Sequence, residues 1–509
     1  MALSLGCARD RGTAQRADEV VVLWEAGPGE LDPRFALSAY SDKVGRLLFS
    51  RLVDVDNEAS EPRFDLALSL EQPSPTTYVF RLREDATFHD GTPVTAADIV
   101  WTFKSLGDPA LKSPYGGVAE RIDSVEALGP HQVRFRLKEV HAPFITDLDM
   151  GIVPKHLTEA TGRFSGPPIG SGPFALESME GPERVTLVRH RQWHGAAPDD
   201  AVSRVRFRAI GDANSRVLAL MGGSGDILQN EVSPLLVPVL ERREDLQVMT
   251  GPSIGLTYLG FNLRDPVLGR QEVREAIAHA IDRRAIIRHK YAGRAREATG
   301  LLAPGHWAYE PDVVSYPYDP ARAMALLDKA GFRDPDGEGP LPRLSLTYKT
   351  TTNRFRLAVA RVLAHYLRQV GIDVEVKAYE WGTFFHDIKS GNFQLYTLQW
   401  PVLVEPDMYG WIFHSERVPT AENRGKGGNR GAYSNPEVDA LIEAGRRSVN
   451  RDERRRIYSG IQRILARELP YVHLWHEDNI AVIRRSVKGW KVLPNARFAA
   501  LAHVRKEGP

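Results

Sequence analysis

The sequence predicts a mixed α/β (α+β) protein built from more than one domain. Its 509 residues exceed what a single ordinary core holds. Segments with the two-residue alternation of strands are separated by capped segments with helical periodicity, an order that layers helices on a sheet. The composition, 42% hydrophobic and 26% charged, is typical of a globular chain.

The most informative segment runs from Tyr78 to Phe103 and reads YVFRLREDATFHDGTPVTAADIVWTF. Its first residues alternate between two faces and predict a strand. Asp90-Gly91 predicts a turn, because glycine adopts positive φ without a Cβ clash. Thr95 and Asp98 have the spacing of a capping box and predict the start of a helix.

Other elements follow the same rules. In the first half we expect strands over 20–24, 132–137 and 205–210 and a tight backbone crossing in IGSGPF at 169–174. The apolar spacing over 273–287 predicts one long helix that ends at Gly293. Helices are expected from Asp319-Pro320 to Gly331 and over 355–370, and strands over 258–262, 344–348, 372–376, 471–475 and 488–493.

Catalytic and metal-binding signatures are missing from the sequence. Gly222 to Gly225 lacks the spacing of a nucleophile elbow, and Gly425-Lys426-Gly427 does not match a phosphate-binding loop. His473 and His476 fall on an expected strand, where positions i and i+3 face opposite sides. We therefore expect no enzyme activity, no cofactor and no resident metal. A net charge of +1 also gives no electrostatic footprint for nucleic acid.

Several of these segments resemble the family 5 extracytoplasmic solute-binding proteins, the dipeptide- and oligopeptide-binding proteins of bacterial ABC importers. The resemblance rests on 78–103, on IGSGPF, and on VREAIAHAIDRRAIIRHKYAG at 273–293. It implies a two-lobed periplasmic-binding-protein fold with an extra subdomain inserted in the first lobe and an interlobe cleft. The implied function is capture of a peptide or peptide-like solute and its delivery to the permease subunits of an ABC transporter.

The resemblance also implies a division of the chain. Residues 19–45, 166–258 and 471–509 are expected to form lobe I, residues 46–165 the inserted subdomain, and residues 259–470 lobe II. Tyr258, Asn262 and Tyr471 are expected at the hinge, where the chain crosses between the lobes. A monomer is expected.

The expected ligand contacts also come from the resemblance. They lie at the end of the first strand, in a Ser-Pro-Tyr segment and in a loop around a tryptophan, and the matching positions are Trp24, Glu25, Tyr115, Gln399, Trp400, Pro401, Val402 and Leu403. Aromatic side chains suit such a site because they bury large areas with few rotatable bonds.

One position departs from the family pattern. Peptide binders carry an aspartate three residues after that tryptophan, which pairs with the ligand's α-amino group, whereas this chain has Leu403 there and Glu405 two residues later. A buried ammonium without a carboxylate partner is costly. A non-peptide ligand, such as a nickel chelate, an oligosaccharide or another small solute, therefore stays an alternative, and an envelope hydrolase is a weaker one.

Cys7 is the single cysteine of the chain, so no intramolecular disulfide can form. Leu5-Gly6-Cys7 resembles the end of a bacterial lipoprotein signal. We interpret residues 1–18 as a truncated signal followed by a polar tether, and we expect lipidation at Cys7. This implies a periplasmic or extracytoplasmic protein anchored to the membrane.

Overall fold

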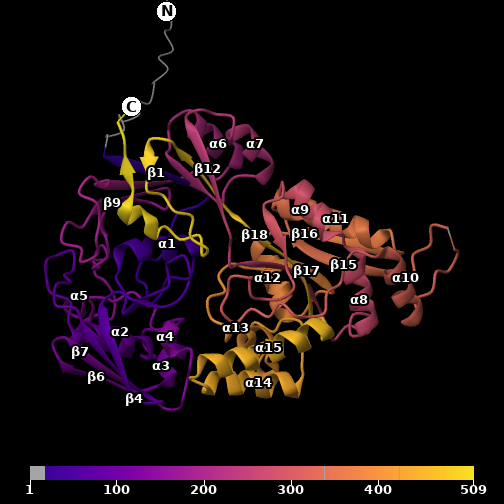
Figure 1. Ribbon diagram of the computed structural model, residues 1–509, viewed down its shortest axis with the longest axis horizontal. Coiled ribbons are helices and arrows are strands. Elements are labelled where there is room, and N and C mark those ends of the chain that lie inside the picture. The colour runs from indigo at the N-terminus through magenta and orange to yellow at the C-terminus, as the bar shows by residue number, and fades with distance from the viewer. Residues whose placement is uncertain (1–17, 338, 424, 509) are drawn as a thin grey trace, which may run out of the picture.

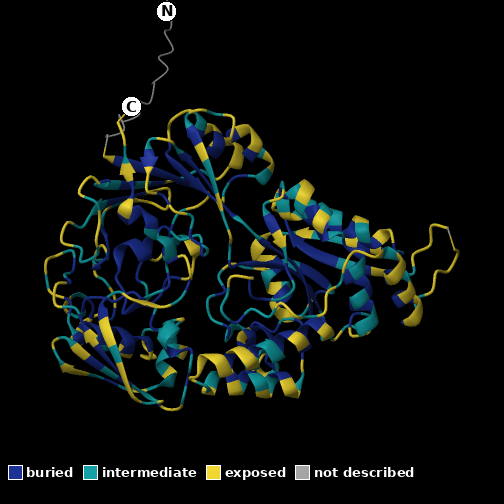
Figure 2. Cartoon of the chain, viewed as in Figure 1, coloured by how far each residue is buried: buried dark blue, intermediate teal, exposed yellow. Residues whose placement is uncertain are grey.

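The computed structural model describes residues 18–337, 339–423 and 425–508. Figure 1 shows two lobes side by side, with a smaller subdomain attached to the first lobe. Buried residues gather in the strands of the sheets, and exposed residues lie on the outer faces of the helices (Figure 2). None of the helices in these three ranges is long and apolar enough to cross a membrane. Cys7 lies outside the described residues.

Lobe I is built on a seven-stranded mixed sheet in the order β12-β19-β11-β1-β10-β9-β8. The central strand β1 runs parallel to β10 and β11, and its residues are buried. The strands are β1 (Glu19–Trp24), β8 (Phe174–Glu180), β9 (Arg184–Arg189), β10 (Arg204–Ala209), β11 (Ile227–Gln229), β12 (Leu246–Gly251) and β19 (Asn479–Arg484). The helices are α1 (Ala39–Leu48), α6 (Ala213–Met221) and α7 (Val237–Leu240), with the short η1 (Pro234–Leu236) and η3 (Ala499–His503) and the ribbon β20 (Val487–Lys488) and β21 (Arg505–Lys506).

The inserted subdomain has its own sheet, β4-β5-β7-β6, and its own core. Its elements are β2 (Val53–Asp54), β3 (Arg63–Phe64), β4 (Ala67–Ser74), β5 (Thr77–Leu82), β6 (Ile122–Gly129), β7 (Gln132–Leu137), α2 (Ala96–Leu106), α3 (Gly116–Arg121), α4 (Phe144–Asp147) and α5 (Lys155–Thr158). The capping box before α2 is formed as expected, and the Thr95 amide donates to Asp98 Oδ2 at 2.9 Å. The buried core extends from Leu52 to Ile152, whereas Phe49 and Val153 pack in lobe I. The division at residues 46–165 stays a prediction.

Lobe II is built on a six-stranded sheet in the order β14-β18-β13-β17-β15-β16, with a hydrophobic core on each face. Helices α8 to α11 contribute to one core and α12 to α15 to the other. The strands are β13 (Leu256–Phe261), β14 (Ala295–Glu297), β15 (Leu344–Thr351), β16 (Ile372–Tyr379), β17 (Leu395–Trp400) and β18 (Tyr471–Glu477). The helices are α8 (Gln271–Ala280), α9 (Arg283–Lys290), α10 (Pro320–Lys329), α11 (Arg354–Arg368), α12 (Trp381–Ser390), α13 (Met408–Phe413), η2 (Ser415–Arg417), α14 (Pro436–Arg447) and α15 (Arg451–Glu468).

The long helix expected over 273–292 is two helices, α8 and α9. Ile281 leaves the helical region with φ −99° and ψ 113°, and the side chain of Asp282 accepts from the Ala285 amide to cap α9. Ile281 and Ile286 are buried in the same core, so the helical spacing of apolar residues continues from α8 into α9 although the helix is interrupted between them.

Two crossovers join the lobes. The first is 252–255, between β12 of lobe I and β13 of lobe II, and the second is Asp478, between β18 and β19. Tyr258 and Tyr471 lie inside the lobe II sheet and stack at 4.2 Å, and the Asn262 side-chain amide donates to Phe393 O at 2.9 Å. The crossovers therefore lie a few residues away from the positions expected for the hinge, on the lobe I side of each.

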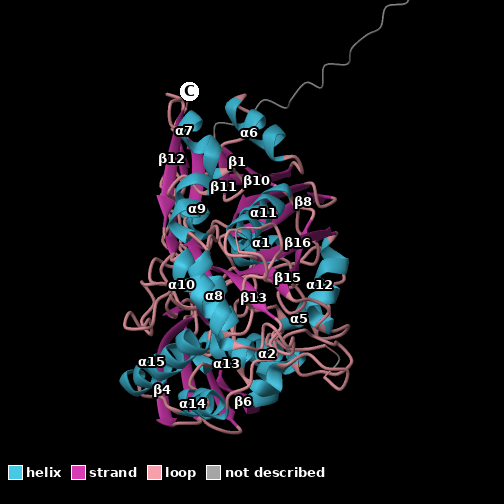
Figure 3. Cartoon of the chain, turned by 90° about the vertical axis from the view of Figure 1, so that its right-hand side faces the viewer, coloured by secondary structure: helices cyan, strands magenta, loops and turns pink. Residues whose placement is uncertain are grey.

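The inserted subdomain also contacts lobe II. The Ala142 amide donates to Arg446 O at 2.7 Å, Thr146 Oγ1 donates to Glu405 Oε2 at 3.4 Å, and Arg451 pairs with Glu61. Both views show α14 beside the inserted subdomain (Figures 1 and 3). These contacts join the inserted subdomain to lobe II in addition to the two crossovers.

Candidate functional site between the lobes

Strand directions bring one edge of each sheet to the crossovers. In lobe I, β12 and β11 are both antiparallel to β19, so β12 runs in the same direction as β1 and β10. In lobe II, β13 is antiparallel to β17, which is parallel to β15 and, through it, to β16. The carboxyl ends of β1, β10 and β11 therefore lie on the side where β12 leaves lobe I, and those of β15, β16 and β17 lie where β13 begins. Carboxyl ends of parallel strands are a usual place for ligands in open α/β sheets.

On the lobe I side, β1 ends at Trp24 and Glu25. Trp24 is only 2% exposed, stacks on Phe207 at 4.6 Å and meets the edge of Tyr40 at 5.3 Å. The indole packs in the core of lobe I, and its expected contact with a ligand stays a prediction. Its Nε1 is buried without a hydrogen-bond acceptor among the described residues. Glu25, in contrast, is exposed.

Tyr40 and Glu231 form a second polar group at this edge. Tyr40 Oη donates to Glu231 Oε1 at 3.2 Å, and Arg216 Nε lies 3.5 Å from Glu231 Oε2. Burial and the carboxylates of Glu231 and Glu25 raise the pKa of Tyr40, so its hydroxyl stays protonated. Burial also raises the pKa of Glu231, against the opposing effect of Arg216. Sequence reasoning did not find this pair, because Tyr40 lies in the first turn of α1, Glu231 follows β11, and neither belongs to a recognisable motif.

Tyr115 is half-buried and holds the loop that follows β1. Its hydroxyl donates to Ala36 O at 2.5 Å, and Ser113 Oγ donates to Arg34 O at 2.7 Å. The Ser-Pro-Tyr segment thus fixes the inserted subdomain to the loop between β1 and α1. Tyr115 lies next to the expected ligand site, and its hydroxyl already donates a hydrogen bond within the protein.

On the lobe II side, Gln399 and Pro401 are exposed, while Trp400 and Val402 are half-buried. Trp400 is the last residue of β17 and lies opposite Leu256, the first residue of β13. Its ring is parallel to that of Tyr258 at 6.1 Å, and its Nε1 has no acceptor among the described residues. Trp381, at the start of α12, is 48% exposed and stacks on Phe385 at 5.3 Å. These rings form an aromatic wall at the carboxyl edge of lobe II.

Leu403 and Glu405 are both used inside the protein. Leu403 is 1% exposed and packs in the lobe II core with α13 to α15, and its expected contact with a ligand stays a prediction. Glu405 pairs with Arg454 and accepts from Thr146. Burial raises the pKa of Glu405, and Arg454 opposes the shift. The loop after Trp400 therefore offers no unpaired carboxylate for an ammonium group.

A pocket of about 120 Å³ lies between the lobes at the crossovers. It is lined by Ser253 and Asp478 of the crossovers, by Ser60, and by His306 and His476 of lobe II. His476 Nδ1 lies 2.8 Å from Gly255 O and donates to it, which leaves Nε2 buried as an acceptor without a partner in the described chain. Burial lowers the pKa of His476 and that of His306, the latter to about 4, so both rings are neutral.

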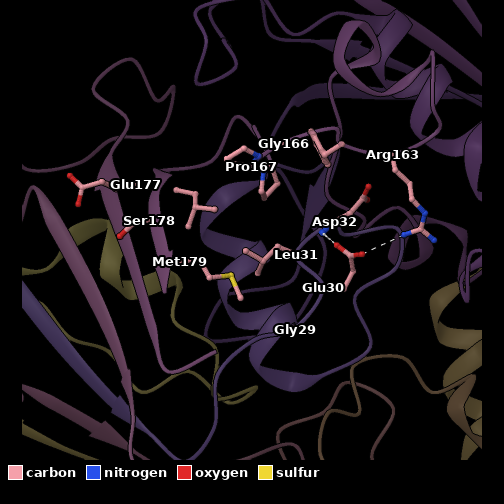
Figure 4. A pocket seen from close by; sticks show the side chains of 13 residues that line it. Gly29, Glu30, Leu31, Asp32, Arg163, Gly166, Pro167, Glu177, Ser178 and Met179 are labelled. Atoms are coloured by element: carbon pink, nitrogen blue, oxygen red, sulfur yellow. Dashed lines mark hydrogen bonds and ion pairs between the residues drawn. The ribbon is translucent and has the colours of Figure 1, made fainter. Parts of the chain in front are cut away.

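A larger pocket, about 390 Å³, lies entirely within lobe I (Figure 4). It is formed by the loop after β1, by residues 163–168 and by β8, the edge strand farthest from the crossovers. One of its three acids, Glu30, accepts a hydrogen bond from the Asp32 amide at 2.9 Å and pairs with Arg163 at 3.4 Å. This pocket is separate from the edges that meet between the lobes. In the described ranges no group of three or more His, Cys, Asp or Glu could hold a metal ion.

Two lobes joined by two crossovers, with the carboxyl edges of their strands turned toward each other, define a two-lobed binding protein. The chain belongs to the bacterial extracellular solute-binding proteins, family 5, whose model matches residues 61–417.

Known relatives cover nearly the whole chain. It is 27% identical to the oligopeptide-binding protein AppA of Bacillus subtilis, over 96% of this chain and 91% of AppA. It is 26% identical to a dipeptide-binding protein of Pseudomonas aeruginosa, over 95% and 94% of the two chains. The solved structure of Bacillus subtilis AppA with a nonapeptide superposes with a TM-score of 0.81 at 25% identity, covering 96% of this chain and 99% of that one. The relatives are binding proteins, and the two-lobed fold expected from the sequence is confirmed.

Proposed function

We propose that this protein captures a peptide or peptide-like solute between its lobes and delivers it to the permease of an ABC importer. The observation that carries the proposal is the meeting of the two carboxyl edges at the crossovers, with Trp400 and Trp381 on one side and Glu25 and Tyr40 on the other. Ligand would favour the closed arrangement because it contacts both edges only when they are close. Relatives named as peptide-binding proteins support the same ligand class.

The loop from Trp400 to Pro406 limits further which ligands can bind. Leu403 is buried and Glu405 is paired with Arg454. A free α-amino group held at this loop would have no anionic partner, and an unpaired buried ammonium is strongly disfavoured. We therefore expect ligands whose amino group is blocked, or held elsewhere, to bind better than ordinary free peptides at this position.

We place the protein outside the cytoplasm, as the family description indicates, and propose that Cys7 carries a lipid anchor. A folded domain tethered to the outer face of the membrane by a polar segment would stay close to its permease. Metabolic labelling with a fatty acid in the native host, compared between the wild type and Cys7→Ser, tests this. Equal labelling of both proteins would rule out the anchor.

A thermal-shift screen tests the proposed ligand class. The purified protein is heated with di-, tri- and longer peptides, with N-acetylated peptides, and with oligosaccharides and nickel–histidine. A ligand at about 100 times its dissociation constant adds about 2.7 kcal/mol of stability if it binds only the folded state. Trp400→Ala should remove the shift, whereas Leu235→Ala, at a 50% exposed position of lobe I, should keep it. Shifts with sugars or nickel–histidine alone would overturn the peptide assignment.

A further inference from the structure

Arg430 lies in an aromatic sandwich at the carboxyl edge of lobe II. Its Cζ is 4.8 Å from the ring centre of Trp400 and 5.1 Å from that of Phe385. Its Nη1 donates to Tyr258 Oη at 3.2 Å. The guanidinium is thus held between two rings, a geometry that favours a cation through the ring quadrupoles, and it is hydrogen-bonded to the neighbouring tyrosine hydroxyls.

No carboxylate neutralises Arg430 among the residues that the structure describes. Its neighbours in lobe II differ in this respect, since Arg446 pairs with Asp407 at 2.6 Å and Arg454 pairs with Glu405. The Nε of Arg430 is buried and has no acceptor in the described chain. An arginine stays charged in proteins, and a buried donor without an acceptor is unfavourable. The site therefore lacks an anion.

The position of Arg430 places this missing anion at the interlobe edge. Trp400 ends β17 beside the first crossover, and Phe385 belongs to α12, which begins directly after β16 ends. Phe385 in turn stacks on Trp381, which is 48% exposed. Arg430 is therefore a cation of the aromatic wall that faces lobe I, where Arg356 also lies over Trp381 and Lys389 over Phe385.

We propose that Arg430 binds a carboxylate group of the ligand. The assignment rests on the proposed function and adds the chemistry of one ligand end. With a ring near each face of the guanidinium, its edge is the direction left for a ligand, and a carboxylate meets that edge with two parallel hydrogen bonds. Together with Leu403 and the paired Glu405, the arginine selects a ligand that carries a free carboxylate and no free ammonium at this wall.

Matched pairs of ligands test the assignment on the full-length protein. The probes are N-acetylated dipeptides with apolar side chains, each as the free acid and as the C-terminal amide, measured by isothermal titration. The wild type should bind the acid at least tenfold more tightly than its amide. R430Q should lose at least tenfold in affinity for the acid and keep its affinity for the amide, which also shows that the variant is folded. R430K should fall between them, because lysine keeps the charge and loses the planar fork.

The control is R284Q, which removes a charge from an arginine of lobe II whose side chain is 86% exposed, and it should bind both probes as the wild type does. If the wild type binds acid and amide with equal affinity, or if R430Q binds the acid as the wild type does, the assignment of Arg430 is overturned while the proposed function stands. A wild-type protein that binds none of the acids or amides overturns the proposed peptide-like ligand, and the assignment with it.

Discussion

Replacing Leu403 by aspartate separates two explanations of this position. If Leu403 stands where a ligand-binding carboxylate would act, Leu403→Asp should create affinity for free peptides. The structure argues for the opposite result, because Leu403 is 1% exposed in the core that α13 to α15 share. The substitution would place a carboxyl group among apolar side chains and remove most of the leucine.

The size of the effect follows from burial. Loss of a fully buried leucine side chain costs about 2 to 5 kcal/mol, and a buried polar group without a partner adds to this. We expect Leu403→Asp to lower the free energy of unfolding of lobe II by about 4 kcal/mol. With a urea dependence of about 2 kcal/mol per molar, the midpoint falls by about 2 M.

Urea unfolding followed by tryptophan fluorescence measures the change, and titration calorimetry with a free dipeptide measures binding. The matched control is Leu235→Asp, at a 50% exposed leucine in lobe I, which should change stability by less than about 0.5 kcal/mol. A Leu403→Asp protein with wild-type stability and new affinity for free dipeptides would refute the reasoning, because it would show that position 403 faces the ligand.

Two further expectations concern closure and pH. Arg451→Gln removes the exposed ion pair with Glu61 between α15 and the inserted subdomain. Ligand affinity should weaken by at most about fivefold, and small-angle scattering should show a more extended particle. Adding Glu61→Gln to the Arg451→Gln protein should change neither quantity further. Full additivity of the two substitutions would contradict a direct pair. Burial lowers the pKa of His473 to about 3, well below its unfolded value, so the neutral ring contributes stability above about pH 6.5 that is lost as pH falls toward 3. His473→Gln should therefore reduce the loss of unfolding free energy between pH 6.5 and 4.5 by about 2 to 3 kcal/mol, and an unchanged pH dependence would show that this ring does not titrate on unfolding.

Local signals in the sequence predicted local structure well. The spacing of Thr95 and Asp98 is sufficient to form the capping box, because both hydrogen bonds join residues within one turn. Asp282 carries the same kind of signal, but the apolar spacing from α8 continues into α9 and hides the new helix that the Asp282 side chain begins. Periodicity reports which side chains are buried, and it does not report a break that preserves the buried face.

The candidate site was less accessible to sequence reasoning, because long-range packing decides it. Trp400 was found from its loop, yet the burial of Leu403 depends on helices α13 to α15, which follow it in the chain. Arg430 lies in a stretch that reads as an ordinary loop, and it gains its position only because Phe385 and Trp400 approach it from two other segments. Neither the composition nor the spacing of that stretch indicates an aromatic sandwich.

One loop connects the proposed ligand wall to the contact between the lobes. Trp400 lies in the aromatic wall, and Glu405, five residues later, contacts Arg454 of lobe II and Thr146 of the inserted subdomain. A ligand that orders the loop at Trp400 also fixes Glu405 against the inserted subdomain, and that contact forms only when the lobes are together. Ligand binding and lobe closure therefore both depend on ordering the segment from Trp400 to Glu405. A ligand shifts the equilibrium between open and closed lobes only by its difference in affinity for the two arrangements. Substitutions at Glu405 should consequently weaken ligand binding although the side chain does not reach the aromatic wall.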